Sequence, residues 1–238
     1  MPHILVAGKL HPAGLALLEQ ARTLGFTHDY VEDITEPSYA PLIDRADALV
    51  LRTQPLSAVT VAKGTQLKVV SRHGVGYDAV DLEALNARGI ALTIVGDVNS
   101  VSVAEHAMMQ MLAAAKRAVR ADQSVRDPGQ WGWRNLLQQQ EISGKRLLIL
   151  GYGRIGRNLA RMAEGFQMEV RAHDPYLDRN GWPVGKVPSA SDLTRGLAWA
   201  DFISVRVPRG PRPAIGAQEI AAMKPGASIG NTAGGGVV

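Results

Sequence analysis

Short apolar runs alternate along this chain with segments of helical periodicity. Apolar runs at 3–8, 47–52, 67–72 and 90–95 predict buried strands, and 12–24 and 79–89 have helical spacing between them. A second alternating set follows, with strands expected at 145–150, 168–174, 201–207 and 227–232 and helices at 154–164, 191–199 and 214–223. Strands that alternate with helices indicate βαβ units. The chain is therefore expected to be an α/β protein with parallel sheets.

The stretch between the two sets has a different character. A long helix is expected from Ser102 to Arg120, because Ser102 and Glu105 have the spacing of a capping box. Residues 126–145 are rich in Pro, Gly and Gln and indicate an arm, with Trp131 and Trp133 packed against other residues. This pattern predicts a domain at 1–100, a connecting helix and arm at 101–145, and a second domain at 146–238.

Composition narrows the classes of protein that fit. Hydrophobic residues make up 46% and charged residues 20% of 238 positions, which is ordinary for a soluble globular protein. A net charge of +4 without a dense basic run argues against a nucleic-acid partner. The absence of cysteine removes disulfides, thiolate metal sites and a cysteine nucleophile. No apolar run reaches a membrane-spanning length and the start is too short for a signal peptide, so a cytoplasmic protein without a metal site is expected.

The segment LLILGYGRIGRNLA contains the most informative motif of the chain. Gly151, Gly153 and Gly156 follow an apolar strand and open a helix, which is the context that a dinucleotide-binding Gly-x-Gly-x-x-Gly motif requires. The first glycine permits the tight turn, the second lets the backbone approach a pyrophosphate, and the third lets helix and strand pack closely. The amides of Arg154 and Ile155 would then face the phosphates.

An acidic residue ends the next expected strand. A carboxylate at Asp174 can accept hydrogen bonds from adenosine ribose hydroxyls and would repel a 2′-phosphate, which favours NAD over NADP. An alternative stays open, in which the glycines form only a turn and Asp174 caps the DPY turn that follows it.

With these motifs in place, the chain resembles the D-isomer-specific 2-hydroxyacid dehydrogenases, which include phosphoglycerate and hydroxypyruvate dehydrogenases. The resemblance covers nearly the whole chain and is most specific at 71–90, 102–107, 151–160 and 223–238. It implies a flavodoxin-like substrate domain at 1–100 and a Rossmann NAD-binding domain at 146–238. It also implies a homodimer formed through the long helix and arm.

The resemblance assigns candidate ligand-binding residues by position. The backbone of Val75 and Gly76 would hold a substrate carboxylate, and Arg52 an anionic substrate group. Ser102 and Thr232 would lie near the cofactor. From the residues alone, a tight turn at 75–76 and a capping Ser102 remain equally open, and a solvated strand-end Arg52 is favoured over a ligand-binding one.

The resemblance fails at the residues that perform the family's chemistry. The family places its carboxylate-binding arginine in Asn-Thr-Ala-Arg-Gly-Gly, whereas this chain has Gly234 at that point, and Arg206 stands where a histidine is common. The family's glutamate and histidine come later than Val238, so a chain truncated at its C-terminus, with the last Rossmann strands missing, is expected. His73 is the one histidine placed to replace the lost base, and no acidic partner for it is evident.

The sequence therefore leaves two predicted functions open. One is an NAD-dependent oxidoreductase of the D-2-hydroxyacid dehydrogenase type, acting on a small 2-hydroxy or 2-keto acid and inactive or impaired as this chain. The other is a non-catalytic NAD-binding pseudoenzyme or dimerising regulatory protein. A two-lobed solute-binding protein fits less well, because no export signal is evident.

Overall fold

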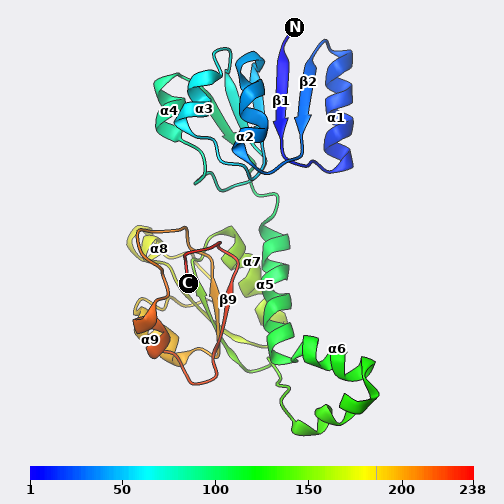
Figure 1. Ribbon diagram of the computed structural model, residues 1–238. Coiled ribbons are helices and arrows are strands. Elements are labelled where there is room, and N and C mark those ends of the chain that lie inside the picture. The colour runs from blue at the N-terminus through cyan, green and yellow to red at the C-terminus, as the bar shows by residue number, and fades with distance from the viewer. Residues whose placement is uncertain (186) are drawn as a thin grey trace. The chain divides into compact units, whose positions relative to one another are not determined.

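Two parallel sheets organise the chain, one in each of two units, Met1–Gly96 and Asp97–Val238 (Figure 1). The computed structural model describes residues 1–185 and 187–238. All strand pairs in both sheets are parallel, as the alternation of apolar runs and helices predicts.

The first unit contains a five-stranded sheet in the order β2-β1-β3-β4-β5, the order of flavodoxin-like folds. Its strands are β1 (His3–Ala7), β2 (Thr27–Val31), β3 (Ala48–Leu51), β4 (Val69–Arg72) and β5 (Ala91–Ile94). Its helices are α1 (Pro12–Thr23), α2 (Glu36–Tyr39), the 3₁₀ helix η1 (Ala40–Arg45), α3 (Ala58–Lys63) and α4 (Leu82–Ala87). Leu5, Leu49, Leu51 and Val70 are fully buried, which explains why these strands are apolar.

The second unit contains a four-stranded sheet in the order β7-β6-β8-β9. Its strands are β6 (Arg146–Leu150), β7 (Glu169–His173), β8 (Phe202–Val205) and β9 (Ser228–Asn231). A single parallel bridge between Ala172 and Ser189 extends the β7 side, so the chain order across the sheet is that of a Rossmann fold. β9 lies at the opposite edge.

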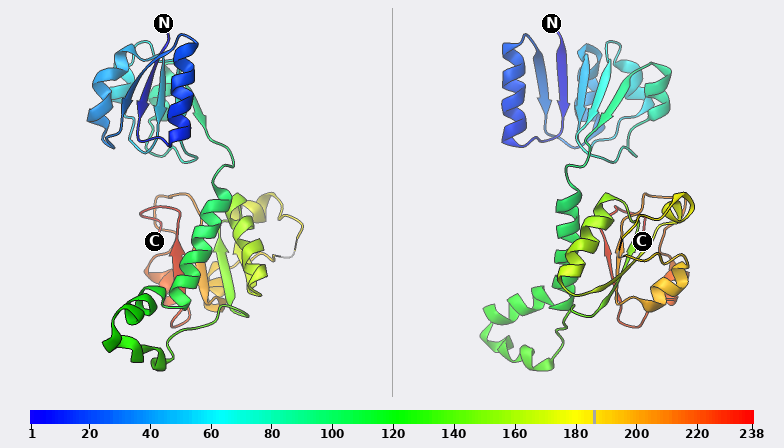
Figure 2. Two further views of the ribbon diagram at one scale, coloured as in Figure 1. Left: turned by 90° about the vertical axis from the view of Figure 1, so that its right-hand side faces the viewer. Right: turned by 180° about the vertical axis from the view of Figure 1, so that it is seen from behind.

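The helices of the second unit are α5 (Ser100–Ala115), α6 (Ala118–Arg126), η2 (Pro128–Leu136), α7 (Arg154–Gly165), α8 (Pro175–Asn180), α9 (Leu193–Trp199) and α10 (Ala217–Ala221). Helices α5 and α7 pack side by side over one face of the sheet, and α6 with η2 projects from the end of α5 as an arm (Figures 1 and 2). Trp133 is buried in this arm, whereas Trp131 is 49% exposed and lies beside the Arg134 guanidinium.

Several expected boundaries were wrong. The helix expected at Ser102–Arg120 is two helices, because Arg117 adopts a left-handed conformation with φ of 50° between α5 and α6. The capping box at Ser102 does not form, since α5 begins at Ser100 with Asn99 as its N-cap. The Ser100 hydroxyl instead accepts a buried hydrogen bond of 2.9 Å from Asn158 Nδ2 of α7, and this tertiary contact fixes the start of the helix.

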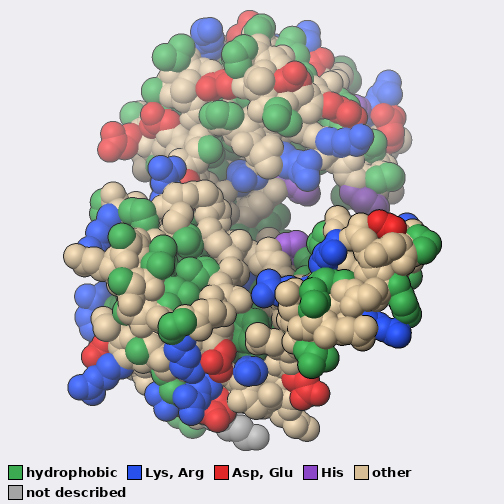
Figure 3. Space-filling view, turned by 60° about the horizontal axis from the view of Figure 1, so that its bottom comes forward, with side chains coloured by type: hydrophobic (Ala, Val, Ile, Leu, Met, Phe, Trp, Pro, Cys, Tyr) green, Lys and Arg blue, Asp and Glu red, His purple; other side chains and the backbone are tan. Residues whose placement is uncertain are grey.

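The surface of the chain is mixed in charge. On the face shown in Figure 3, basic and acidic side chains are interspersed with polar and hydrophobic ones. Within residues 1–185 and 187–238, no helix combines the length and apolarity needed to cross a bilayer.

Candidate functional site

The first and third glycines of the loop after β6 are required by backbone geometry. Gly151 has a φ of 91°, and a Cβ atom there would lie 2.6 Å from the carbonyl oxygen of Arg206. A Cβ atom at Gly156 would lie 2.4 Å from the carbonyl oxygen of Gly151 and 3.2 Å from Ile149 Cγ2. Helix α7 can therefore approach β6 only with glycine at position 156.

Gly153 is different, because a Cβ atom there would meet nothing within 4 Å. Nothing in the protein itself therefore requires glycine at this position. The second glycine of a dinucleotide-binding loop keeps the backbone open for a pyrophosphate. The open space at Gly153, beside two glycines that the fold requires, fits a diphosphate group.

The start of α7 supplies donors for that group. Gly153 is the N-cap of the helix and, because it has no side chain, cannot accept hydrogen bonds from the first helix amides. Within the described residues, the amides of Arg154 and Ile155 have no recorded hydrogen-bond acceptor. Such amides, together with the helix dipole, favour bound anions. Arg154, Arg157 and Arg161 also line a surface pocket of about 580 Å³ beside the loop.

Asp174 ends β7 and already accepts three hydrogen bonds. Its Oδ2 accepts from the Tyr152 amide at 2.9 Å, and its Oδ1 accepts from the amides of Tyr176 and Leu177, both at 3.1 Å. The capping role left open by the sequence is thus real. A carboxylate has about four acceptor positions, so one remains for a ribose hydroxyl. The same side chain links the glycine loop to the start of α8 and keeps one acceptor position free.

An aromatic pair stiffens the loop from its other side. The rings of Tyr152 and Trp182 stack with centroids 5.4 Å apart and planes 5° from parallel. The Arg157 guanidinium lies 5.8 Å from the Tyr152 ring centroid. Since Tyr152 follows Gly151, this packing restrains the loop before any ligand binds.

Two further predicted cofactor residues occupy contrasting positions. Ser102 is exposed in the first turns of α5 rather than at its cap. Thr232 directly follows β9, and its hydroxyl oxygen is buried without a hydrogen-bond partner in the described part of the chain. Thr232 therefore has an unused polar atom at the carboxyl end of the sheet, whereas the role of Ser102 stays a prediction.

The first unit brings two arginines together at the carboxyl ends of its strands. Arg72 ends β4 in register with Leu51 of β3, and Arg52 follows directly. Burial, and then the charge of Arg52, lower the pKa of the Arg72 guanidinium. Within residues 1–185 and 187–238 neither guanidinium has a recorded acidic partner. Sequence reasoning missed Arg72, whose proximity to Arg52 depends on strand register.

The predicted carboxylate loop follows these arginines. Val75 and Gly76 are exposed, and their amides have no recorded acceptor in the described structure. His73 lies at the start of the same loop, where its amide donates to the carbonyl oxygen of Leu51 at 2.7 Å. Its imidazole is exposed and has no recorded partner among the described residues. The loop offers free donors next to two cations, which is an arrangement suited to an anion.

Comparisons with known proteins identify this arrangement. The family "D-isomer specific 2-hydroxyacid dehydrogenase, NAD binding domain" matches residues 108–238, more than half of the chain. The chain belongs to this family. NAD is accordingly the cofactor of its second unit.

Individual relatives agree with the family assignment. D-3-phosphoglycerate dehydrogenase of Methanocaldococcus jannaschii is 34% identical over all of this chain, which spans 45% of that protein's length. Hydroxypyruvate reductase of Thermotoga maritima is 34% identical over 93% of this chain and 71% of its own length. The crystal structure of the TT0316 protein from Thermus thermophilus superposes with a TM-score of 0.90 at 28% identity, covering 99% of this chain and 75% of that one.

The family's arginine position lies in an ordered glycine turn. Gly234 has a φ of 116° and Gly236 a φ of 75°, conformations that side chains rarely adopt. Asn231 holds the turn, since its Nδ2 donates to the Gly234 carbonyl oxygen and its Oδ1 accepts from the Ala233 amide, both at 2.9 Å. The turn of this family member thus has no side chain at position 234, where the resemblance expects the carboxylate-binding arginine, while the Arg209 guanidinium lies beside Gly236.

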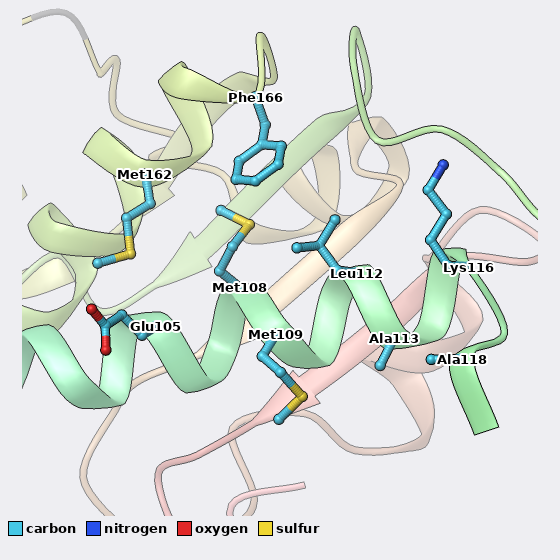
Figure 4. A pocket seen from close by; sticks show the side chains of 9 residues that line it. All are labelled: Glu105, Met108, Met109, Leu112, Ala113, Lys116, Ala118, Met162 and Phe166. Carbon is cyan, nitrogen blue, oxygen red and sulfur yellow. The ribbon is translucent and has the colours of Figure 1, made fainter. Parts of the chain in front are cut away.

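The outer face of α5 and α7 carries an apolar groove. Its volume is about 650 Å³, and it is lined by Glu105, Met108, Met109, Leu112, Ala113, Lys116, Ala118, Met162 and Phe166. In Figure 4, Met108 of α5 and Met162 and Phe166 of the α7 segment point into the same space. The groove lies on the helix that the sequence predicted as a dimer contact.

No group of three or more His, Asp or Glu side chains that could hold a metal occurs among the described residues.

Proposed function

We propose that this chain binds NAD through the loop at 151–156 and belongs to an oxidoreductase that acts on a small 2-hydroxy or 2-keto acid. The observation that carries the proposal is the contrast among the three glycines: 151 and 156 are required by the fold, whereas 153 is not and leaves the backbone open at the start of α7. NAD supplies a hydride acceptor at its nicotinamide ring. The chain supplies the amides of Arg154 and Ile155 for the phosphates and Asp174 for the ribose.

The cationic loop of the first unit supports an acid with a second anionic group. Arg52 and Arg72 repel each other, and a dianionic group such as a phosphate would neutralise both while the amides of Val75 and Gly76 bind a carboxylate. The name of one relative, D-3-phosphoglycerate dehydrogenase, fits such a substrate, and the name of another, hydroxypyruvate reductase, fits a 2-keto acid that carries the carboxylate alone. We therefore propose 3-phosphoglycerate, or hydroxypyruvate, as the substrate type, with the first unit as the substrate domain.

A titration and a turnover assay test the proposal together. NADH is expected to bind and to quench tryptophan fluorescence, with NADPH binding roughly tenfold more weakly because the carboxylate of Asp174 repels a 2′-phosphate. Turnover of hydroxypyruvate with NADH, or of 3-phosphoglycerate with NAD, is expected at least about 10²–10³-fold below that of a relative with arginine at this turn, because the missing guanidinium alone accounts for that factor. No binding at millimolar NADH would refute the cofactor assignment, and rapid, saturable oxidation of NADH would refute the reduced turnover.

A non-catalytic NAD-binding protein is the second candidate. The glycine turn held by Asn231 favours it, because a φ of 116° at position 234 is a conformation that side chains rarely adopt. NADH binding with no measurable turnover on any 2-keto acid would support this alternative.

We also propose a homodimer through α5 and the arm. Exposed apolar patches of this kind on a monomer mark interaction surfaces, and methionine and aromatic side chains are enriched in such contacts. Met109 is 48% exposed at the groove, and Leu136 and Leu137 of the arm are 61% and 87% exposed. The Met109→Lys variant is expected to sediment as a monomer while the wild type sediments as a dimer.

A matched control is available on α1, where Leu17 is 65% exposed. The Leu17→Lys variant adds the same charge and is expected to leave the dimer intact. A wild-type chain that sediments as a monomer, or an M109K variant that remains dimeric, would contradict the proposed interface.

A further inference from the structure

A row of buried polar atoms lacks hydrogen-bond partners in the part of the chain that the structure describes. The atoms are Oε1 of Gln110, Oγ of Ser204, Nε and Nη2 of Arg206, and Oγ1 of Thr232. Each buried polar atom left without a partner costs free energy, so such a row needs an explanation.

These side chains share one face of the sheet. Ser204 and Arg206 alternate with Val205 and so point to the same side as Phe202, which packs with α5 and α7. Ser204 is the register partner of Gly230, where a Cβ atom would lie 3.3 Å from Gln110 Oε1 of α5. Thr232 follows two residues after Gly230 on the same side. Arg206 and Thr232 directly follow the paired ends of β8 and β9, at Val205 and Asn231, and so lie at the carboxyl ends of two adjacent strands.

Arg206 also adjoins the cofactor loop. Its amide donates to the Leu150 carbonyl oxygen at 2.8 Å, and its own carbonyl oxygen limits the space at Gly151. Ligands of open α/β sheets bind outside the carboxyl ends of the strands, beside this loop. Arg206 and Thr232 thus lie where a dinucleotide or its co-substrate is held.

The guanidinium of Arg206 lacks a counter-ion among the described residues. Its one recorded hydrogen bond is a long one, in which Nη1 donates to the Val205 carbonyl oxygen at 3.3 Å, and no carboxylate pairs with it. Burial lowers the pKa of Arg206 to about 10, so the group is still charged at neutral pH. Arg206 is half-buried, with Nε and Nη2 shielded from solvent, and a bound oxyanion would offset the cost of leaving them without a partner through charge-assisted hydrogen bonds.

We propose that Arg206 and Thr232 form an oxyanion-binding site for a phosphate or carboxylate oxygen of the ligand held at this edge of the sheet. The inference rests on the proposed function and extends it. Position 234 in the neighbouring turn has no side chain, and the Arg209 guanidinium lies beside Gly236 of that turn, so Arg206 is a second cation at this end of the sheet. The oxyanion has two possible sources, the diphosphate of NAD and the carboxylate of the 2-keto acid.

Calorimetric titrations of the full chain with two probes distinguish these sources. ADP-ribose carries the diphosphate, and oxamate, added in the presence of NADH, carries the carboxylate of an unreactive pyruvate analogue. The Arg206→Met variant is expected to bind one of them roughly tenfold or more weakly than the wild type, since a charged hydrogen bond is lost. Loss of ADP-ribose affinity assigns the phosphate, and loss of oxamate affinity assigns the carboxylate.

Two more variants complete the experiment. Arg195→Met removes an exposed arginine of α9 that pairs only with Asp192, and it is expected to bind both probes like the wild type. Thr232→Val, which loses only a hydroxyl group, is expected to weaken the same probe as R206M and decides the question if R206M does not fold. If R206M and T232V both bind every probe as tightly as the wild type does, the inference is overturned. A wild type that fails to bind ADP-ribose would instead overturn the proposed function, and the inference with it.

Discussion

The Gly156→Ala variant is expected to lose NADH affinity by roughly 10²-fold and to unfold more easily by about 1–3 kcal/mol. The added Cβ atom would lie 2.4 Å from the Gly151 carbonyl oxygen, which is backbone and cannot rotate away. Helix α7 must then move off β6, and the amides of Arg154 and Ile155 move with it. Chemical denaturation measures the stability and fluorescence titration measures the affinity.

The opposite end of the same helix provides the control. A Cβ atom at Gly165 would meet nothing within 4 Å, so Gly165→Ala is expected to keep the NADH affinity and to stabilise the chain by about 0.5–1 kcal/mol through helix propensity. If G156A binds NADH as tightly as G165A does, the close packing of helix on strand is not what positions the phosphate donors.

The Asp174→Ala variant is expected to lose both structure and ligand selectivity. It removes the cap of α8 and leaves the Tyr152 amide without its acceptor, which together lower the free energy of unfolding by about 2–3 kcal/mol. NADH affinity should fall while the preference for NADH over NADPH disappears, because no carboxylate remains to accept from the ribose or repel a 2′-phosphate. Parallel titrations with NADH and NADPH measure this preference.

Asp192→Ala separates the capping effect from the ligand effect. Asp192 caps α9 by accepting from the Arg195 amide at 3.1 Å, and it has no recorded contact with the glycine loop. D192A is expected to lose about 1 kcal/mol of stability and to keep the full preference for NADH. A D174A variant that still discriminated between the two cofactors would remove the ribose role from Asp174.

The fold was largely accessible from the sequence because its strands are buried. Runs such as 145–150 are apolar since both faces of β6 are covered, and the parallel two-sheet architecture was confirmed. Strand β2 escaped prediction because its THDYV sequence is polar. It is an edge strand whose Thr27 and Asp29 side chains bond to His3 on the neighbouring strand. Edge strands need less apolar surface, and their pattern is correspondingly weak.

The residues of the candidate site also differed in how far the sequence could predict them. The spacing of Gly151, Gly153 and Gly156 predicted a loop whose geometry depends on local backbone conformation, which sequence specifies well. The sequence showed Arg206 only as a departure from the family pattern. It could not predict that Nε and Nη2 are buried without a partner, because that depends on how α5 packs on β8 and β9. The capping box at Ser102 failed for a similar reason, since a contact to α7 selects where α5 begins.

The conformation at Gly234 restricts which residues this position accepts. A Cβ atom there would meet nothing within 4 Å, so space is not what limits the choice. An arginine would instead have to adopt a φ of 116°, at a cost of order 1–3 kcal/mol, unless the backbone of the turn changed shape. The backbone torsion, rather than the available volume, thus determines how readily this turn admits a side chain.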